Sequence, residues 1–160
     1  MSNPLNTDAA RKEESMMEQK ITQFSVPVRN QPGTLFRMAQ VLSEVGINLS
    51  GISSQTFGEM SYIHFQADKD PGAVRRPLEN AGYQVFENAA FIVECPMDPA
   101  PIQRIIDKLA DEDVRVVRLY GTSDKGESAR LVVCVDRPEK ARAAFNHMGV
   151  KSRSMGPPSP

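Results

Sequence analysis

Two asparagines and a Pro-Gly turn make up the part of this sequence that is best suited to bind a small charged molecule. Asn30 and Asn48 each bring an amide that both donates and accepts hydrogen bonds. Gly33 lets the backbone approach a ligand closely. A helix that starts at Thr34 would offer unpaired N–H groups and a partial positive charge, which suit an anion. Together these groups are suited to hold a small zwitterion.

The elements that must position these residues are a strand, a helix and a second strand. The sequence predicts an extended run over Ile21–Val28, which the Pro32-Gly33 pair ends. Apolar residues then recur at helical spacing and predict one buried helix face: Leu35, Met38, Ala39, Leu42 and Val45. Gly46 is typical of a helix C-terminus. Ile47-Asn48-Leu49 then opens the next strand, which we expect to reach Phe57 with a bulge at Gly51.

This arrangement resembles the ACT domain, a βαββαβ module that binds amino acids and regulates metabolism. The resemblance is carried by Asn30-Gln31-Pro32-Gly33-Thr34-Leu35 and by Gly46-Ile47-Asn48. These segments are similar to the Asn-x-Pro-Gly loop and the Gly-x-Asn-Ile corner of the regulatory domain of phosphoglycerate dehydrogenase, where both Asn positions contact the bound amino acid. The resemblance implies a ligand held by the loop Asn30–Leu35 and the corner Ile47–Leu49, against a neighbouring ACT-like unit.

Two observations limit what the resemblance implies. In that enzyme a ligand-contacting His stands two residues before the first Asn, and here Val28 holds that position, so serine specificity does not carry over. The Asn-x-Pro-Gly sequence is also good turn chemistry before a helix. A purely structural role for the loop therefore stays open at this point.

A second copy of the pattern follows about 67 residues later. Pro32, Leu42 and Pro71 recur as Pro99, Leu109 and Pro138, each 67 positions further on. The predicted fold is therefore α+β, with two ferredoxin-like βαββαβ repeats that resemble ACT domains. The second repeat has only a weak, polar last strand, around 150–155. The predicted organisation is a flexible N-terminal tail over 1–20, domains over 21–88 and 89–155, and a flexible tail over 156–160.

The second repeat keeps the core pattern but not the proposed site. Met97 and Arg115 stand where the first repeat has Asn30 and Asn48. Helix starts are predicted in both repeats, with these residues as caps: Asp70 before Pro71, Asp98 before Pro99, and Asp136 with Glu139 as a capping box. The last strand of the first repeat is expected at Tyr83–Phe86, and the second repeat is expected to begin near Ala89.

No constellation for catalysis or metal binding is visible. His64 and His147 belong to different repeats, and Cys95 and Cys134 fall on opposite strand faces without metal-type spacing. No nucleophile has an adjacent base. We therefore expect no enzyme activity, no catalytic residues, no metal and no cofactor. Packed thiols are expected for both cysteines.

Charge and composition exclude further classes. A net charge of -1 gives no attraction to nucleic acid, and no apolar run is long enough to cross a bilayer. The first twenty residues are polar and show no secretory signal, so a cytoplasmic protein is expected. RNA-recognition modules need a basic-aromatic third strand, which is absent here. Heavy-metal carriers need Cys-x-x-Cys, and acylphosphatase-like enzymes need a Gly-rich loop ending in Arg; neither is present.

The leading hypothesis is a non-catalytic regulatory protein that binds an amino acid through tandem ACT-like repeats. Exposed sheet edges predict that the repeats pack together and that the chain forms a homodimer. The alternative is a regulatory subunit that docks on an amino-acid biosynthetic enzyme, like the small subunit of acetolactate synthase. The visible repeat argues against a close match, because the second half of that subunit is of another design.

Overall fold

The computed structural model describes residues 16–96, 98–124 and 128–152. Contacts divide the chain into two compact units. Thr22–Asn88 forms one, called here the 22–88 unit. The other, called here the C-terminal unit, consists of the residues up to Ile21 together with those from Ala89 onward. Each unit combines antiparallel strands with two helices.

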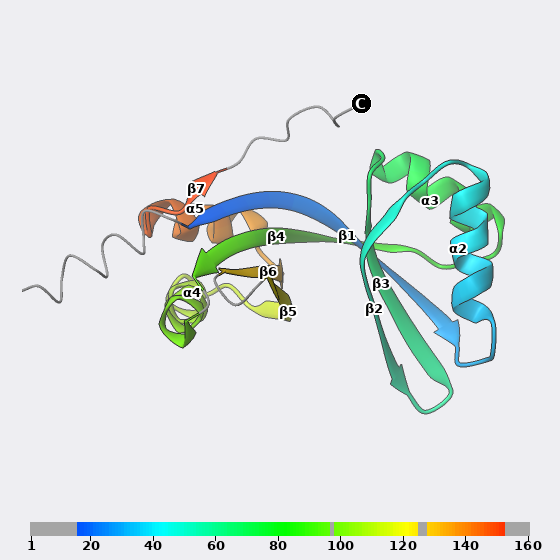
Figure 1. Ribbon diagram of the computed structural model, residues 1–160, viewed down its shortest axis with the longest axis horizontal. Coiled ribbons are helices and arrows are strands. Elements are labelled where there is room, and N and C mark those ends of the chain that lie inside the picture. Colours follow the sequence, from blue (N-terminus) through cyan, green and yellow to red (C-terminus); the bar gives the residue numbers. More distant parts are fainter. Residues whose placement is uncertain (1–15, 97, 125–127, 153–160) are drawn as a thin grey trace, which may run out of the picture. The chain divides into compact units, whose positions relative to one another are not determined.

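The 22–88 unit follows a β-α-β-β-α-β order. Its elements are β1 (Met17–Arg29), α2 (Thr34–Glu44), β2 (Leu49–Phe57), β3 (Met60–Ala67), α3 (Pro71–Asn80) and the start of β4 (Phe86–Pro96). β3 pairs antiparallel with both β1 and β2. The two helices lie on the same side of these strands (Figure 1). The core between them contains Phe24, Val26, Met38, Leu42, Ile63, Phe65, Val74 and Leu78.

Local chemistry explains where these elements begin and bend. α2 begins at Thr34, as the sequence predicts. Asp70 caps α3 through a 3.0 Å bond from the Gly72 N–H to its carboxylate. The register of β2 against β3 shifts between Ser50 and Ser53, around Gly51 with its φ of +54°, which confirms the predicted bulge.

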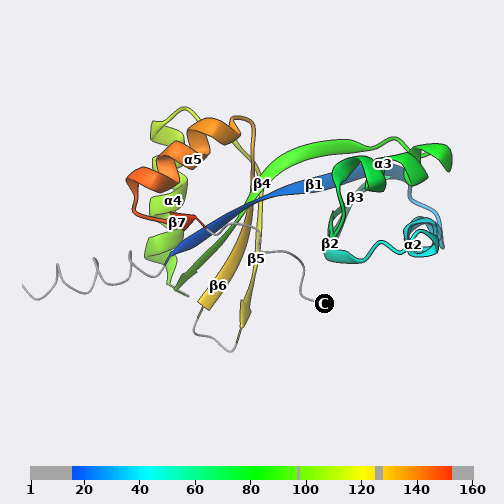
Figure 2. The ribbon, with the colours of Figure 1, turned by 90° about the horizontal axis from the view of Figure 1, so that it is seen from above.

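The C-terminal unit places two helices on one face of a sheet (Figure 2). Its elements after β4 are α4 (Pro99–Asp111), β5 (Val116–Asp124), β6 (Ser128–Val135), α5 (Pro138–His147) and β7 (Lys151–Ser152). The strand order is β1-β4-β6-β5, with β7 parallel to β1. Phe91, Val93 and Cys95 face the helices, and the alternate residues of β4 join a second apolar cluster on the other face.

The N-terminal tail expected over 1–20 overlaps the start of β1 by several residues. β1 begins at Met17, Met16 is fully buried, and Glu18 is 1% exposed. The Lys151 N–H donates to the Met16 carbonyl at 3.0 Å, so β7 holds the start of β1. β1 contributes its first residues to the C-terminal unit and its remainder to the 22–88 unit. The low hydrophobicity of residues 1–20 concealed this pairing with a segment over a hundred residues away.

The two strands expected at Tyr83–Phe86 and near Ala89 are one continuous strand, β4. Residues 83–85 are not part of it. The sequence between Phe86 and Pro96 contains no glycine or proline that would end a strand, so the chain stays extended across the boundary between the units.

Two expectations in the second half also need correction. The last strand expected over 150–155 is reduced to the two residues of β7, and residues 153–160, including the expected tail, lie outside the described residues. Asp136 does not cap α5. Arg137 occupies the N-cap position without a side-chain bond, and the Asp136 carboxylate accepts instead from Arg115. Asp98 does cap α4, with a 3.0 Å bond from the Ala100 N–H.

Candidate functional site

The predicted loop follows β1 and is open to solvent. Asn30, Gln31 and Pro32 are exposed, and the Asn30 N–H donates to the Glu59 carbonyl at 2.7 Å. The Thr34 N–H donates to the Gln31 carbonyl at 3.2 Å, which closes the turn before α2. The loop therefore lies beside the β2–β3 turn and presents the Asn30 side chain to solvent at that end of the sheet.

Gly33 and Arg37 fix the shape of the loop. Gly33 is the N-cap of α2 with a φ of +80°, a conformation that favours glycine. A Cβ added there would lie 3.1 Å from Arg37 Nη1, so Gly33 makes room for the Arg37 guanidinium. Arg37 Nη2 donates to Thr34 Oγ1 at 3.1 Å, and Nη1 donates to the Pro32 carbonyl at 3.4 Å.

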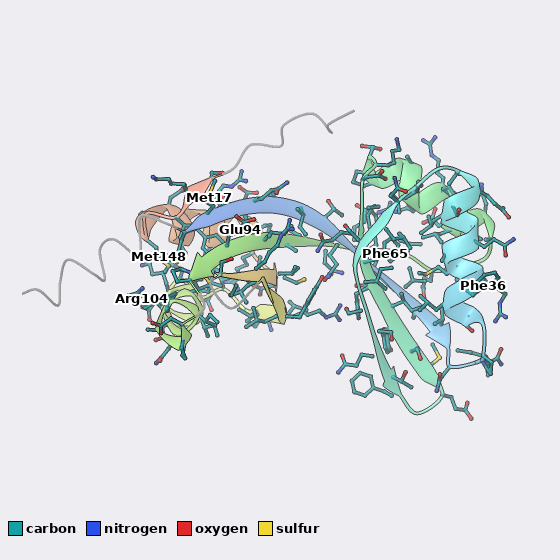
Figure 3. The ribbon with its side chains drawn as sticks, viewed as in Figure 1. Met17, Phe36, Phe65, Glu94, Arg104 and Met148 are labelled. Carbon is teal, nitrogen blue, oxygen red and sulfur yellow. The ribbon has the colours of Figure 1, made fainter. Side chains whose placement is uncertain are left out.

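Arg37 adds a positive charge to the helix start. Sequence reasoning missed this residue because the motif ends at Leu35. The signal that could have found it is its position three residues after Thr34, since side chains at this spacing are neighbours on a helix. The guanidinium and the partial positive charge at the start of α2 make this end of the unit favourable for a carboxylate. Leu35 and Phe36 are 44% and 71% exposed, and Phe36 projects from α2 away from the strands (Figure 3).

The corner is held by one carboxylate that sequence reasoning also missed. The Asn48 N–H donates to Asp68 Oδ1 at 3.1 Å, and Asn48 Nδ2 donates to Asp68 Oδ2 at 2.9 Å. The hydrogen bond from the Asn48 side chain is the main reason that the pKa of Asp68 lies below its usual value. Ile47 is buried in the core and Leu49 packs against it, so these two neighbours anchor the corner and do not face solvent freely.

Within one 22–88 unit the loop and the corner are far apart. The loop bonds to Glu59, just before β3, and the corner bonds to Asp68, just after it. β3 has eight residues and spans about 27 Å at about 3.4 Å per residue. That length is several times the size of a free amino acid. The predicted site residues therefore form two separate half-sites in the unit, which agrees with the expectation that a neighbouring ACT-like unit takes part in the site.

β2 runs from one half-site to the other and is an edge strand without charged residues or prolines. It ends the order of the described strands and pairs only with β3. None of its nine residues is charged or a proline, and seven of them are exposed. Ile52 and Phe57 are 48% and 62% exposed. Edge strands usually carry charges or prolines that prevent pairing, so a long uncharged edge is suited to pair with another strand.

The C-terminal unit has a counterpart of the corner. The Arg115 N–H donates to Asp136 Oδ1 at 2.9 Å, and Arg115 Nε donates to Asp136 Oδ2 at 2.9 Å. The hydrogen bond from the Arg115 side chain is the main reason that the pKa of Asp136 is lowered. Met97, which stands in the position of Asn30, lies outside the described residues.

His64 and the two cysteines are buried within the fold. His64 is 3% exposed and its Nδ1 lies 2.8 Å from Ser25 Oγ. Neither of the two cysteines is in a disulfide, both are buried, and burial raises the pKa of the Cys134 thiol to about 11. Such thiols are poor nucleophiles. The described part of the chain contains no group of three or more His, Cys, Asp or Glu side chains placed to hold a metal, and none of its helices has the length and apolarity to span a membrane.

Residues 22–82 match the sequence model of the ACT domain family. No curated protein matches the chain in sequence. Among solved structures, protein BT0572 from Bacteroides thetaiotaomicron has a TM-score of 0.73 at 19% identity, over 84% of this chain and 92% of that one. The regulatory subunit of aspartate kinase from Thermus flavus has a TM-score of 0.60 at 18% identity, over 83% and 95% of the two chains. Its ligand-free counterpart from Thermus thermophilus has a TM-score of 0.56 at 16% identity, over 82% and 91%.

The sequence of residues 22–82 is thus similar to that of ACT domains. The likeness to the solved structures shows that the fold is shared over most of both chains.

Proposed function

We propose that the protein is a non-catalytic regulator that binds an amino acid through the ACT domain over 22–82, and that residues 89–155 form a second, ACT-like repeat. The observation that carries this proposal is the arrangement around β2. Its uncharged edge has the loop Asn30–Leu35 at one end and the corner Ile47–Leu49 at the other. Both half-sites therefore lie at the ends of a strand that is suited to pair with a partner.

A second copy of the chain can complete the site. Two β2 strands that pair antiparallel about a two-fold axis place the start of one strand beside the end of the other. The corner of each copy then faces the loop of its partner, and two equivalent sites form. The ligand is bound between Asn30 of one copy and Asn48 of the other, and Gln31, Pro32, Gly33 and Thr34 shape the loop side. A homodimer is thus required for binding.

A screen with the twenty proteinogenic amino acids tests this function. We expect one or a few of them to raise the unfolding temperature, because a ligand at about a hundred times its dissociation constant stabilises the folded state by about 2.7 kcal/mol. Calorimetry on the positive compounds should give one site per chain. Sedimentation should show a dimer whose dissociation is weakened by the same compounds. A chain that remains monomeric while binding an amino acid would contradict the shared site.

A second candidate function is that of a regulatory subunit bound to an amino-acid biosynthetic enzyme. It is favoured by the shared fold with regulatory subunits of aspartate kinase over most of both chains. Purification of the tagged full chain from its native source, followed by mass spectrometry, distinguishes the two functions. A stoichiometric enzyme partner supports the subunit, and isolation of the chain alone supports the independent regulator.

A further inference from the structure

We propose that the Asp68 carboxylate binds the ammonium group of the ligand, so that the site selects amino acids over the corresponding acids without an amino group. This inference rests on the proposed function and assigns the polarity of the ligand within that site. Asp68 belongs to neither sequence motif and has no role in the predicted set of site residues.

The corners of the two units share one arrangement of hydrogen bonds. Each corner residue stands directly before a strand, which is β2 in the 22–88 unit and β5 in the C-terminal unit. Its backbone N–H donates to one carboxylate oxygen of an aspartate, and its side chain donates to the other oxygen. The donor is Asn48 in the 22–88 unit and Arg115 in the C-terminal unit. The two aspartates, Asp68 and Asp136, lie at the end of the third strand of each pattern.

The two corners differ in charge. Arg115 brings a guanidinium that forms a 2.9 Å ion pair with Asp136, so that corner contains its own cation. Asn48 makes equivalent hydrogen bonds but is neutral, and within the described residues no ion pair joins Asp68 to a cation. Asp68 is exposed and can be reached from solvent. The 22–88 unit thus has a carboxylate in the place where its counterpart is neutralised by an arginine.

The opposite half-site has the opposite charge. Arg37 and the start of α2 favour a carboxylate at the loop. With the loop of one copy facing the corner of another, a ligand carboxylate lies at the loop and an ammonium lies at Asp68. This places the two charges of an amino acid against complementary groups. Lys69 is near enough to lower the pKa of Asp68 but forms no ion pair with it, and a 2-hydroxy or 2-oxo acid has no ammonium group to pair with this carboxylate.

The replacement Asp68→Asn tests the role of the charge, with Asp136→Asn as its matched control. Each variant replaces the carboxylate that accepts from the corner residue's backbone N–H and side chain, and unfolding curves show whether both fold. Calorimetry uses each amino acid that binds the wild type, together with its 2-hydroxy acid. We expect Asp68→Asn to weaken amino-acid binding by at least about tenfold, the loss typical of a hydrogen bond to a charged group. Asp136→Asn should bind as the wild type does.

A second variant does not depend on the stability of Asp68→Asn. Asn48→Arg copies the Arg115–Asp136 pair into the 22–88 unit, so it is expected to fold and to neutralise Asp68 internally. Amino-acid binding should then be lost. The proposal is overturned if Asp68→Asn or Asn48→Arg binds an amino acid as tightly as the wild type, or if the 2-hydroxy acids bind the wild type equally well. If no amino acid binds the wild type, the proposed function fails as well.

Discussion

Removing the arginine that faces buried Glu18 should destabilise the C-terminal unit. The Glu18 side chain is fully buried, and neither of its oxygens accepts a hydrogen bond. Arg142 Nε lies 3.7 Å from Glu18 Oε1, and its guanidinium lies 6.0 Å from the centre of the Phe91 ring. This contact joins α5 to the first residues of β1. The Glu18 carboxylate therefore depends on Arg142 to offset its desolvation.

The expected loss can be worked from these contacts. Breaking a fully buried ion pair costs about 3–5 kcal/mol, because one charge remains buried and uncompensated. The Arg142 side chain is 42% exposed and the pair is long, so a loss at or below the lower end of this range applies. We expect Arg142→Ala to lower the free energy of unfolding by about 2–3 kcal/mol, including a small cation–π contribution. Glu18→Leu should be neutral or stabilising, because Arg142 can reach water and the buried carboxylate is gone.

Urea unfolding followed by circular dichroism measures both changes. Lys20→Ala is the matched control, because Lys20 of β1 also forms an ion pair with α5, through Glu139 at the surface. Such surface pairs contribute about 0–1 kcal/mol. The reasoning is refuted if Glu18→Leu costs more than about 2 kcal/mol while Arg142→Ala costs nothing measurable. That result would mean that the carboxylate itself stabilises the fold.

Three further predictions concern the loop and the corner of the C-terminal unit. Asn30→Ala should weaken amino-acid binding by about ten- to a hundredfold without changing unfolding, as measured by calorimetry, while Met97→Ala in the equivalent position should bind normally. Gly33→Ala should lower the free energy of unfolding by about 1–2 kcal/mol, because its φ of +80° disfavours a side chain, and an unchanged urea midpoint would contradict this. Arg115 lowers the pKa of Asp136 from 3.8, so the pair contributes stability above about pH 4 that is lost as the pH falls through the lowered value. Asp136→Asn should therefore destabilise the chain at pH 7 and destabilise it less as the pH falls below about 4, and a loss that does not change with pH would show that the charge is irrelevant.

Local patterns predicted the helices and the inner strands. The apolar spacing of Met38, Ala39 and Leu42 places α2, whereas Leu35 and Val45 of the predicted buried face are exposed. Asp70 and Asp98 cap the helices that follow them. These features depend on residues a few positions apart, whose chemistry is visible in the sequence. The bulge at Gly51 belongs to the same group, because glycine in a strand marks such a site.

Features that depend on long-range pairing were not predictable in this way. Asp136 looked like a helix cap because it precedes Pro138, but Arg115, twenty-one positions earlier, takes its carboxylate. Asp68 and Asn48 are likewise twenty positions apart, so their hydrogen bonds cannot be predicted without the register of β2 against β3. Glu18 falls within the expected tail over 1–20. Its burial cannot be predicted from neighbouring residues, since its partner Arg142 lies on the last helix.

The separation of Asn30 from Asn48 follows from the connection between them. A helix that joins two strands of one sheet carries the chain from one end of the sheet to the other, so residues just before and just after it lie at opposite ends. α2 has eleven residues and is about 16 Å long at 1.5 Å per residue. A ligand that contacts both asparagines must therefore be shared by two units. The two motifs together thus support an antiparallel pairing of two copies more strongly than either supports a site within one. A variant with a charge on the β2 edge, Ser54→Lys, should abolish both the dimer and amino-acid binding, and loss of only one of them in sedimentation and calorimetry would separate the site from the edge.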